Sequence, residues 1–429
     1  MSLIETRVGF GFGIGFGLGL AVPLVVLAGA CGGASATSQP REAIVLGGPP
    51  PFEVVSRTQW PTEGWPVVEP EEVGMDPAAV DRLAAYVFAR SGDDVDRKGQ
   101  RTNALVIVKD GKLVFERYAR GYGPDSSLLT WSVSKSIAGT LVGRAVMEGK
   151  LDVNDPVARH YPPVDREGVR EIRIVDLLQM SSGLDWNETY ETSPVFSSVM
   201  AMLYTRGRAD MAAFVASHEL AHPPGTHWSY SSGDTNLMMG ALRGAVGEEA
   251  WPDYPWTALF DELGMRSAVW ERDGAGTIVG SSYLYASARD LAKWAFLYLS
   301  DGVWDGKRLL PEGWVAFTLT MAPAYYDTEL TPGTLDDNPG AQVYLNHGDP
   351  KRGVDKPWPE APDDTFAAQG HWGKVIFVIP SLDMIAVRLG DDRQYTCNRP
   401  DASDGCEPDE DKAYSKHHFL ELLMATVPR

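Results

Sequence analysis

Cysteine is scarce in this sequence, and negative charge far outweighs positive charge. The 429 residues include 3 Cys, and 38 Lys and Arg stand against 58 Asp and Glu, which gives a net charge of −20. Residues 1–30 hold one Glu and one Arg, so the rest of the chain carries the same net charge. An acidic surface repels the phosphates of nucleic acids, and this argues against nucleic acid as a partner.

Three other patterns are missing. There is no internal repeat, and no Gly-x-Ser-x-Gly motif, which argues against an α/β-hydrolase nucleophile. His218, His222 and His227 share one segment, but they lack a metal-binding spacing and Pro223-Pro224 would break their helix. We therefore predict that they are surface or loop histidines, and that the protein uses no metal and no organic cofactor.

The N-terminal segment has the features of an export signal. An uncharged apolar stretch runs from Val8 to Ala30 and ends in Leu27-Ala28-Gly29-Ala30-Cys31-Gly32, which resembles a bacterial lipoprotein cleavage box. We predict a signal peptide over residues 1–30 and a lipid on Cys31, which would anchor the protein to a membrane, in the periplasm or at the cell surface. An ordinary signal peptide or a single membrane span are the alternatives, because the stretch is long enough to cross a bilayer.

Two boundaries follow from composition. Residues 31–70 are rich in Pro, Gly, Ser and Thr without periodicity, which predicts a flexible tether before a folded domain over residues 71–429. Cys397 and Cys406 lie close together in a Pro, Asp and Gly-rich segment. Such a pair usually forms a disulfide outside the cytosol, and we predict one here, with two free thiols as the alternative.

Hairpins near both ends of this domain, with helices between them, indicate the fold class. Strand-like runs over 104–109 and 112–119 flank Asp110-Gly111, and runs over 375–379 and 384–389 flank Pro380-Ser381. Helical spacing predicts helices over 76–88, 134–148, 287–299 and 412–425, with a mostly helical region over 151–250 and a polar surface excursion over 327–366. We predict an α+β fold in which both chain ends build one antiparallel sheet, flanked by helices, with a mostly helical inserted region.

Ser132 and Lys135 form the sharpest chemical pattern. They lie three residues apart at a predicted helix start, so their side chains share one face. A serine hydroxyl needs an adjacent base, and a lysine can serve if burial or a nearby cation lowers its pKa. The helix N-terminus also offers backbone N–H groups to a developing oxyanion. Because Ser-x-x-Lys can arise by chance in a chain of this length, the flanking sequence is needed to show whether this pair is a catalytic motif.

The flanking blocks carry a family resemblance from about residue 75 onward. They are Gly149-Lys150-Leu151-Asp152, the run from Ile174 to Trp186 that contains Ser181-Ser182-Gly183-Leu184-Asp185, and the run from Val279 to Asp290. With Ser-x-x-Lys, they resemble the serine β-lactamase and penicillin-binding-protein superfamily, in particular its class C-like branch of esterases and 6-aminohexanoate-dimer hydrolases. The resemblance implies a β-lactamase/D,D-peptidase-like fold, with Ser132 as the nucleophile and Lys135 as the base.

The family's second motif is a tyrosine followed two residues later by Asn or Ser. It matches Tyr230-Ser231-Ser232 after Pro223-Pro224-Gly225. The resemblance implies that Tyr230 passes a proton between Ser132, Lys135 and the leaving group. Tyr344-Leu345-Asn346 fits the spelling too, but it lacks the Pro-Pro-Gly approach, so we assign Tyr344 to the surface or a pocket wall.

The third motif, Lys or His-x-Gly on a sheet strand, matches His371-Trp372-Gly373. The resemblance implies that the backbone N–H groups of Ser132 and Lys374 form the oxyanion hole, with His371, Trp372 and Gly373 beside the substrate. His371 could equally be a cleft-wall residue without a catalytic role. Trp186 and Tyr190 are candidates for the acyl pocket, with buried aromatic residues of the helical part as the alternative.

These residues predict an exported serine hydrolase that cleaves small-molecule esters or short amides. Ser232 stands where class C β-lactamases carry an Asn that grips the substrate amide, and His371 stands where they carry a Lys. Both changes favour an esterase or amidase over a β-lactamase or a D,D-peptidase that acts on cell-wall peptides. A catalytically inactive binding module is disfavoured, because Ser132, Lys135 and Tyr230 are all present.

Overall fold

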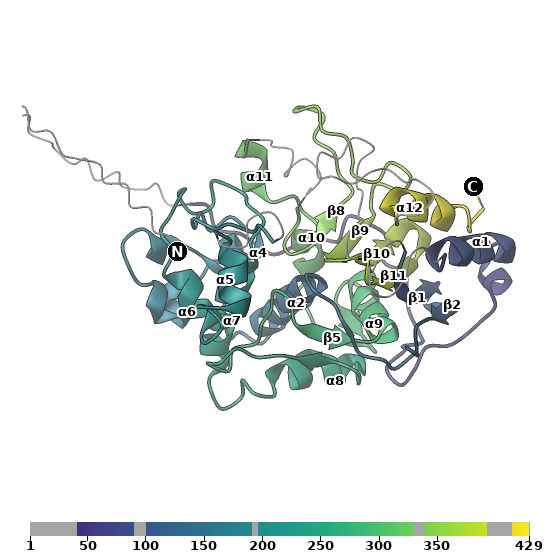
Figure 1. The fold of residues 1–429 in the computed structure, drawn as a ribbon, viewed down its shortest axis with the longest axis horizontal. Coiled ribbons are helices and arrows are strands. Elements are labelled where there is room, and N and C mark those ends of the chain that lie inside the picture. Colours follow the sequence, from purple (N-terminus) through teal and green to yellow (C-terminus); the bar gives the residue numbers. More distant parts are fainter. Residues whose placement is uncertain (1–40, 90–99, 191–195, 330–338, 393–413, 429) are drawn as a thin grey trace, which may run out of the picture. The chain divides into compact units, whose positions relative to one another are not determined.

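A computed structural model describes residues 41–89, 100–190, 196–329, 339–392 and 414–428 (Figure 1). Residues 44–429 group into one compact unit, apart from residues 1–43. The predicted signal peptide and the cysteines Cys31, Cys397 and Cys406 lie outside the described residues. Over the ranges that are described, no helix is long and apolar enough to cross a membrane.

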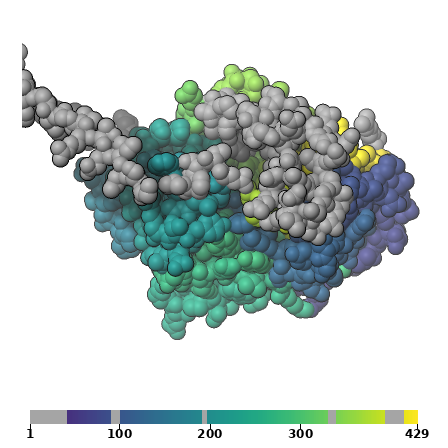
Figure 2. All heavy atoms as spheres, viewed as in Figure 1, coloured from purple at the N-terminus to yellow at the C-terminus, as the bar shows by residue number. Residues whose placement is uncertain are grey.

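The main sheet has six antiparallel strands drawn from both ends of the unit. Their order is β2 (Lys112–Tyr118), β1 (Thr102–Lys109), β11 (Met384–Gly390), β10 (Lys374–Ile379), β9 (Phe366–Gly370) and β8 (Tyr344–Leu345). β1 pairs with β11, and Val106 lies opposite Val387. The α+β fold predicted from the sequence is confirmed. In the space-filling view, the blue and yellow segments of the two chain ends lie together, beside the teal helical part (Figure 2).

Local turn chemistry closes both predicted hairpins. Asp110 and Gly111 have φ values of 52° and 72°, and a tight two-residue hairpin turn requires positive φ at both positions. β10 and β11 are joined through η5 (Pro380–Leu382) and Asp383, whose φ is 44°. Asp383 also forms an ion pair with Arg57 at 2.6 Å, so the irregular segment around Arg57 is tied to this turn.

Alternation of side chains along the strands divides the core into two layers. Leu105 and Ile107 of β1 pack with α1 (Pro77–Val87) and α12 (Lys416–Met424) on one face. Val106 and Val108 face the other layer, which contains α2 (Val133–Met147) and α9 (Ala288–Leu299). Burying one such aliphatic side chain stabilises a fold by about 1.5–3 kcal/mol. Helices therefore cover both faces of the sheet (Figure 1).

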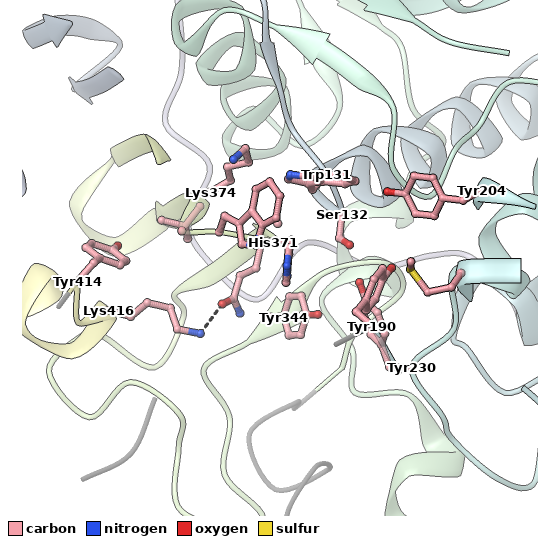
Figure 3. A pocket seen from close by; sticks show the side chains of 16 residues that line it. Trp131, Ser132, Tyr190, Tyr204, Tyr230, Tyr344, His371, Lys374, Tyr414 and Lys416 are labelled. Carbon is pink, nitrogen blue, oxygen red and sulfur yellow. Dashed lines mark hydrogen bonds between the residues drawn. The ribbon is translucent and has the colours of Figure 1, made fainter. Parts of the chain in front are cut away.

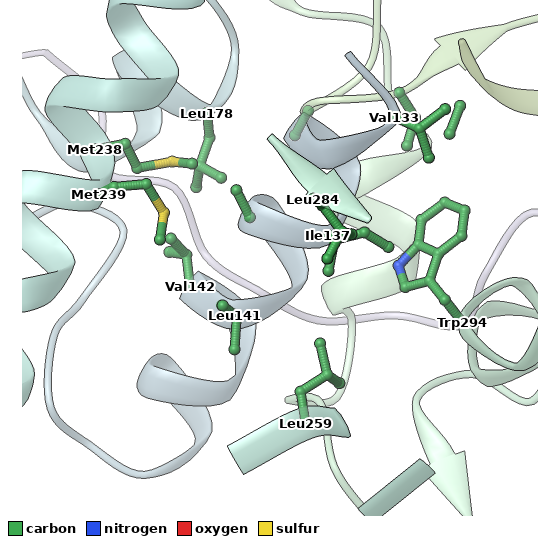
Figure 4. Packing of buried hydrophobic residues seen from close by; sticks show 14 of the residues in the cluster. Val133, Ile137, Leu141, Val142, Leu178, Met238, Met239, Leu259, Leu284 and Trp294 are labelled. Atoms are coloured by element: carbon green, nitrogen blue, oxygen red, sulfur yellow. The ribbon is translucent and has the colours of Figure 1, made fainter. Parts of the chain in front are cut away.

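Helix α2, which directly follows Ser132, is buried around almost its whole circumference. The predicted stripe of Ile137, Leu141, Val142 and Ala145 is buried, but so are the polar side chains of Ser136 and Thr140. The reason is the position of α2, which contacts both β9 and α7 (Ser232–Val246). Figure 4 shows Met238 and Met239 of α7 on one side of it and Trp294 of α9 on the other.

Helices are the main regular elements between β2 and β8, including residues 151–250, for which a mostly helical region was predicted. Besides α2, α7 and α9 the chain between β2 and β8 contains α3 (Val157–His160), α4 (Ile174–Leu178), α5 (Ser198–Tyr204), α6 (Met211–Ala216), α8 (Asp261–Leu263), α10 (Trp314–Thr318) and α11 (Pro323–Asp327). Short helical turns add η1 (Pro70–Val73), before the sheet, and η2 (Pro162–Val164), η3 (Val169–Glu171) and η4 (Trp256–Phe260). Small sheets are formed by β3 (Leu128–Leu129), β5 (Leu284–Ala286) and β4 (Val269–Trp270), and by β6 (Val303–Trp304) and β7 (Lys307–Arg308).

Two sequence predictions need correction. The tether was predicted to reach residue 70, but Ile44, Phe52 and Trp60 pack against the core and Trp65 is buried. Scattered apolar side chains can dock an irregular chain without any periodic pattern. The excursion over 327–366 was predicted to lie on the surface, but it supplies β8 to the sheet edge and buries Trp358.

Candidate active site

Ser132 lies at the N-terminal end of α2, and Lys135 follows one turn later. The Nζ of Lys135 is 3.1 Å from the Oγ of Ser132. Trp131 has a φ of 49°, a left-handed conformation that costs a bulky residue about 1–3 kcal/mol. Backbone strain of this kind is typical of functional sites, and here it lies directly before the candidate nucleophile.

Three oxygen atoms surround the amine of Lys135. Its Nζ contacts Ser132 Oγ at 3.1 Å, Ser232 Oγ at 2.9 Å and the carbonyl of Ser281 at 3.0 Å. The ring centroid of Tyr230 lies 4.9 Å from the same atom. The structure thus brings together the three residues to which the sequence assigned the chemistry.

Tyr230 is held at the entrance of α7. Ser231 caps this helix, because its Oγ accepts the backbone N–H of Asp234 at 2.9 Å. The carboxyl of Asp234 in turn accepts hydrogen bonds from the hydroxyls of Ser182 at 2.7 Å and Ser231 at 3.0 Å. Asp234 is fully buried, and this burial raises its pKa to about 7. The Ser-Ser-Gly-Leu-Asp block and the tyrosine motif are therefore joined through one buried carboxyl group.

The third motif forms the turn between β9 and β10. Trp372 and Gly373 have φ values of 62° and 76°, and a Cβ on Gly373 would lie 2.0 Å from Asp392 Oδ2. Asp392 pairs with the fully buried Arg388, whose Nη1 also donates to the Gly373 carbonyl at 2.7 Å. Only glycine leaves room for this ion pair, which packs against the turn.

The end of β9 lies directly against the chain that leads to the nucleophile. A Cβ on Gly370 would meet the Thr130 carbonyl at 2.2 Å and the Ser132 backbone nitrogen at 3.3 Å. In the sheet, Lys374 pairs with Gly370. The start of β10, which carries Lys374, is thus brought next to the N-terminus of α2, which carries Ser132.

Ser132 lines a cavity of about 500 Å³, and many of the other lining side chains are aromatic (Figure 3). Tyr190 stacks on His371 with ring centroids 5.7 Å apart, and the ring of Trp131 lies nearly perpendicular to the same imidazole at 6.2 Å. Burial and the nearby Glu188 carboxylate raise the pKa of Tyr190 well above 10, so its phenol stays protonated near neutral pH. The lining residues are Trp131, Ser132, Tyr190, Met200, Tyr204, Tyr230, Tyr344, Gln369, Gly370, His371, Trp372, Gly373, Lys374, Val375, Tyr414 and Lys416.

Two predicted substrate-binding residues do not line this cavity. Ser232 is fully buried behind Lys135, and its hydroxyl contacts Lys135 and Glu188. Trp186 packs against Gly233 and lies 5.3 Å from the ring of His218, in the helical part. Trp186 is therefore a packed aromatic residue of the helical part, which was the alternative to a place in the acyl pocket. The other predicted substrate-binding residues do line the cavity: Tyr190, His371, Trp372 and Gly373.

The second tyrosine motif has a different position. Tyr344 is a wall of the cavity, and its ring centroid is 6.5 Å from that of Tyr230. Asn346 is buried, and its Nδ2 donates to the carbonyls of Trp358 and Pro362, both at 2.9 Å. The amide of Asn346 therefore holds the chain between β8 and β9 in place.

Sequence reasoning missed Glu188. Its carboxylate contacts Ser232, Trp186 and Tyr190 from a segment without regular structure. The motif spacings give no signal for this residue, because it reaches α7 only through the folding of the segment that follows Ser182-Gly183.

Comparisons with known proteins show the family of the chain. A family model described as Beta-lactamase matches residues 87–399. The 6-aminohexanoate-dimer hydrolase of Paenarthrobacter ureafaciens is 28% identical over 228 residues, which cover 51% of this chain and 57% of the relative. The chain spans about half the length of the curated relatives that it matches.

Solved structures show the same fold. EstCE1, described as a hydrolase with promiscuous acyltransferase activity, aligns with a TM-score of 0.58 and 15% identity, over 82% of this chain and 98% of that one. A penicillin binding protein from Bacillus halodurans aligns with a TM-score of 0.51 and 15% identity, over 69% and 93% of the two chains. At these identities the likeness is one of fold.

Proposed function

The chain belongs to the β-lactamase family, a superfamily of serine hydrolases, and from this we propose that it hydrolyses esters or short amides through an acyl-enzyme on Ser132. One observation carries the proposal: the Nζ of the buried Lys135 lies 3.1 Å from the Oγ of Ser132, which lines the cavity. A nucleophile and a base within hydrogen-bond reach are what acyl transfer requires.

The reaction follows from the positions of these groups. Ser132 Oγ bonds to the substrate carbonyl carbon while its proton passes to Lys135 Nζ. The carbonyl oxygen becomes an oxyanion, which the backbone N–H groups of Ser132 and Lys374 stabilise by a few kcal/mol. The C–O or C–N bond to the leaving group then breaks, and that group takes the proton from Lys135 through Tyr230.

Water completes the cycle. It attacks the acyl carbon and loses a proton to the same base, and Ser132 regains its proton as the acid is released. The reaction needs no metal and no organic cofactor.

The cavity walls and the buried Ser232 support the substrate class. Aromatic side chains around Ser132 suit an apolar acyl or alcohol group. Ser232 contacts Lys135 and Glu188, so it offers no grip for the side-chain amide of a β-lactam. The similarity to a 6-aminohexanoate-dimer hydrolase also supports small linear amides as substrates of this protein.

The location and partners of the protein are part of the proposal. We infer that residues 1–30 direct export and that Cys31 carries a lipid, so that the domain faces the periplasm or the cell surface and meets small-molecule substrates there. The Cys31→Ser variant should leave the membrane fraction or fail to mature. Unchanged fractionation would contradict lipid attachment.

A substrate comparison tests the proposed specificity. Purified protein should turn over short-chain p-nitrophenyl esters with a kcat/KM far above that for nitrocefin, and the Ser132→Ala variant should turn over neither. The similarity to a penicillin binding protein makes the β-lactamase or D,D-peptidase activity the second candidate. A nitrocefin kcat/KM equal to that of the best ester would establish this second activity instead.

A further inference from the structure

The carboxylate of Glu188 lies behind the catalytic pair and receives four hydrogen bonds. Its Oε2 accepts the indole N–H of Trp186 at 2.6 Å and the backbone N–H of Ser232 at 2.9 Å. Its Oε1 accepts the hydroxyls of Ser232 at 2.5 Å and Tyr190 at 3.0 Å. Four donors that converge on two oxygen atoms are the arrangement of an ionised carboxylate, which can only accept hydrogen bonds.

This arrangement fixes the direction of the next hydrogen bond. The Ser232 hydroxyl has one proton, and that proton points to Glu188. Towards Lys135, 2.9 Å away, Ser232 Oγ can therefore act only as an acceptor. The Ser281 carbonyl, 3.0 Å from the same Nζ, is also only an acceptor. Asn236 holds Ser281 in place through hydrogen bonds to its backbone N–H and its hydroxyl.

The consequence concerns the lone pair of the base. A neutral lysine amine has two N–H bonds and one lone pair. If the two N–H bonds point to Ser232 Oγ and the Ser281 carbonyl, the lone pair is left for the third neighbour, Ser132 Oγ at 3.1 Å. We propose that Glu188 is a positioning residue that acts through Ser232 to aim the lone pair of Lys135 at the proton of Ser132. This inference rests on the proposed acyl-enzyme function.

A Glu188→Gln substitution should reverse this order. Its amide oxygen would face the fixed donors, the indole and backbone N–H groups, and its NH₂ group would face the Ser232 hydroxyl. Ser232 would then accept from the amide and turn its own proton towards Lys135. That proton would compete with Ser132 for the lone pair of Lys135, so proton transfer from Ser132 would slow.

A double-mutant cycle separates this role from simple support of the loop. The variants are Glu188→Gln, Ser232→Ala and their combination, with Asp185→Asn as the matched control, because Asp185 is an exposed carboxylate of the same segment. For each full-length variant we would measure kcat and KM for p-nitrophenyl acetate and the rate at which a fluorophosphonate labels Ser132, with circular dichroism as a check on folding.

We expect Glu188→Gln and Ser232→Ala each to lower kcat and the labelling rate by on the order of 10- to 100-fold, with KM changed less than about threefold. The kcat and labelling rate of the combined variant should lie within about threefold of those of Ser232→Ala, because the effect of Glu188 passes through the Ser232 hydroxyl. Asp185→Asn should match the wild type.

Three results would overturn the positioning role: wild-type kinetics in Glu188→Gln, wild-type kinetics in Ser232→Ala, or losses that multiply in the combined variant. Ser232→Ala leaves the Glu188 segment intact, so it tests the proposal even if Glu188→Gln fails to fold. Failure of the proposed function looks different, because the wild type itself would then show no labelling at Ser132.

Discussion

The buried carboxyl of Asp234 makes the thermal and chemical stability of this protein depend on pH in a defined way. Asp234 accepts from the hydroxyls of Ser182 and Ser231 and from the backbone N–H of Ser182, and only 2% of it is exposed. Asp234→Asn can keep all three hydrogen bonds. Its amide oxygen would accept the backbone N–H, and its NH₂ group would donate to the two hydroxyls, which can rotate to accept.

The magnitude follows from the pKa. Burial raises the pKa of Asp234 from its ordinary value of 3.8 to about 7. A folded-state pKa above the unfolded one gives stability that is fully present below about pH 3.8 and is lost as the pH rises to about 7. At 1.36 kcal/mol for each pH unit, the wild type loses about 2 kcal/mol by pH 5 and about 4 kcal/mol by pH 8. Asn does not titrate, so the Asp234→Asn variant escapes this loss.

Urea denaturation at pH 5 and pH 8 measures the effect. The free energy of unfolding of Asp234→Asn minus that of the wild type should be larger at pH 8 by about 2–3 kcal/mol. Any fixed cost of the substitution cancels in this comparison. Asp185→Asn, at an exposed carboxylate, should show no such change. An Asp234→Asn difference that is equal at the two pH values would refute the reasoning.

Three further predictions concern the active site. In Lys135→Arg the guanidinium stays protonated and has no lone pair to accept the proton of Ser132, so kcat/KM for a p-nitrophenyl ester should fall by at least about 100-fold, and substantial residual activity would exclude Lys135 as the base. Tyr230→Phe should slow the hydrolysis of an anilide far more than that of the matching p-nitrophenyl ester, because p-nitrophenolate leaves without a proton; equal losses would contradict proton delivery by Tyr230. Gly373→Ala places a Cβ 2.0 Å from Asp392 Oδ2, so it should displace the turn beneath the cavity and abolish ester hydrolysis, whereas Gly121→Ala, at an open turn with a similar positive φ, should retain activity.

Much of the fold could be predicted because its signals are local. Asp110-Gly111 determines a turn from its own chemistry, and the pairing of β1 with β11 follows once both hairpins must bury their apolar faces. The spacing of Ser132 and Lys135 places them on one helix face, and the structure shows their atoms in contact. Period and turn chemistry act within a few residues, so the sequence displays them directly.

The rest depends on contacts between distant segments. Residues 44–70 have the composition of a tether, yet Arg57 pairs with Asp383, more than 300 residues away in the sequence. Glu188 lies in an irregular segment, and its contact with Ser232 arises only when that segment folds onto the start of α7. Because Ser232 contacts Glu188, its hydroxyl does not line the cavity, although the motif alone predicted a substrate-binding residue there. Such encounters leave no periodic trace in the sequence.

The central claim is that Ser132 forms the acyl-enzyme with Lys135 as its base. Mass spectrometry of protein treated with a fluorophosphonate, or quenched during turnover of a slow ester, tests it most directly. We expect one added group on the peptide that carries Ser132, no addition in Ser132→Ala, and strongly slowed addition in Lys135→Arg. Modification at Ser134 or Ser136, or an unchanged rate in Lys135→Arg, would contradict it.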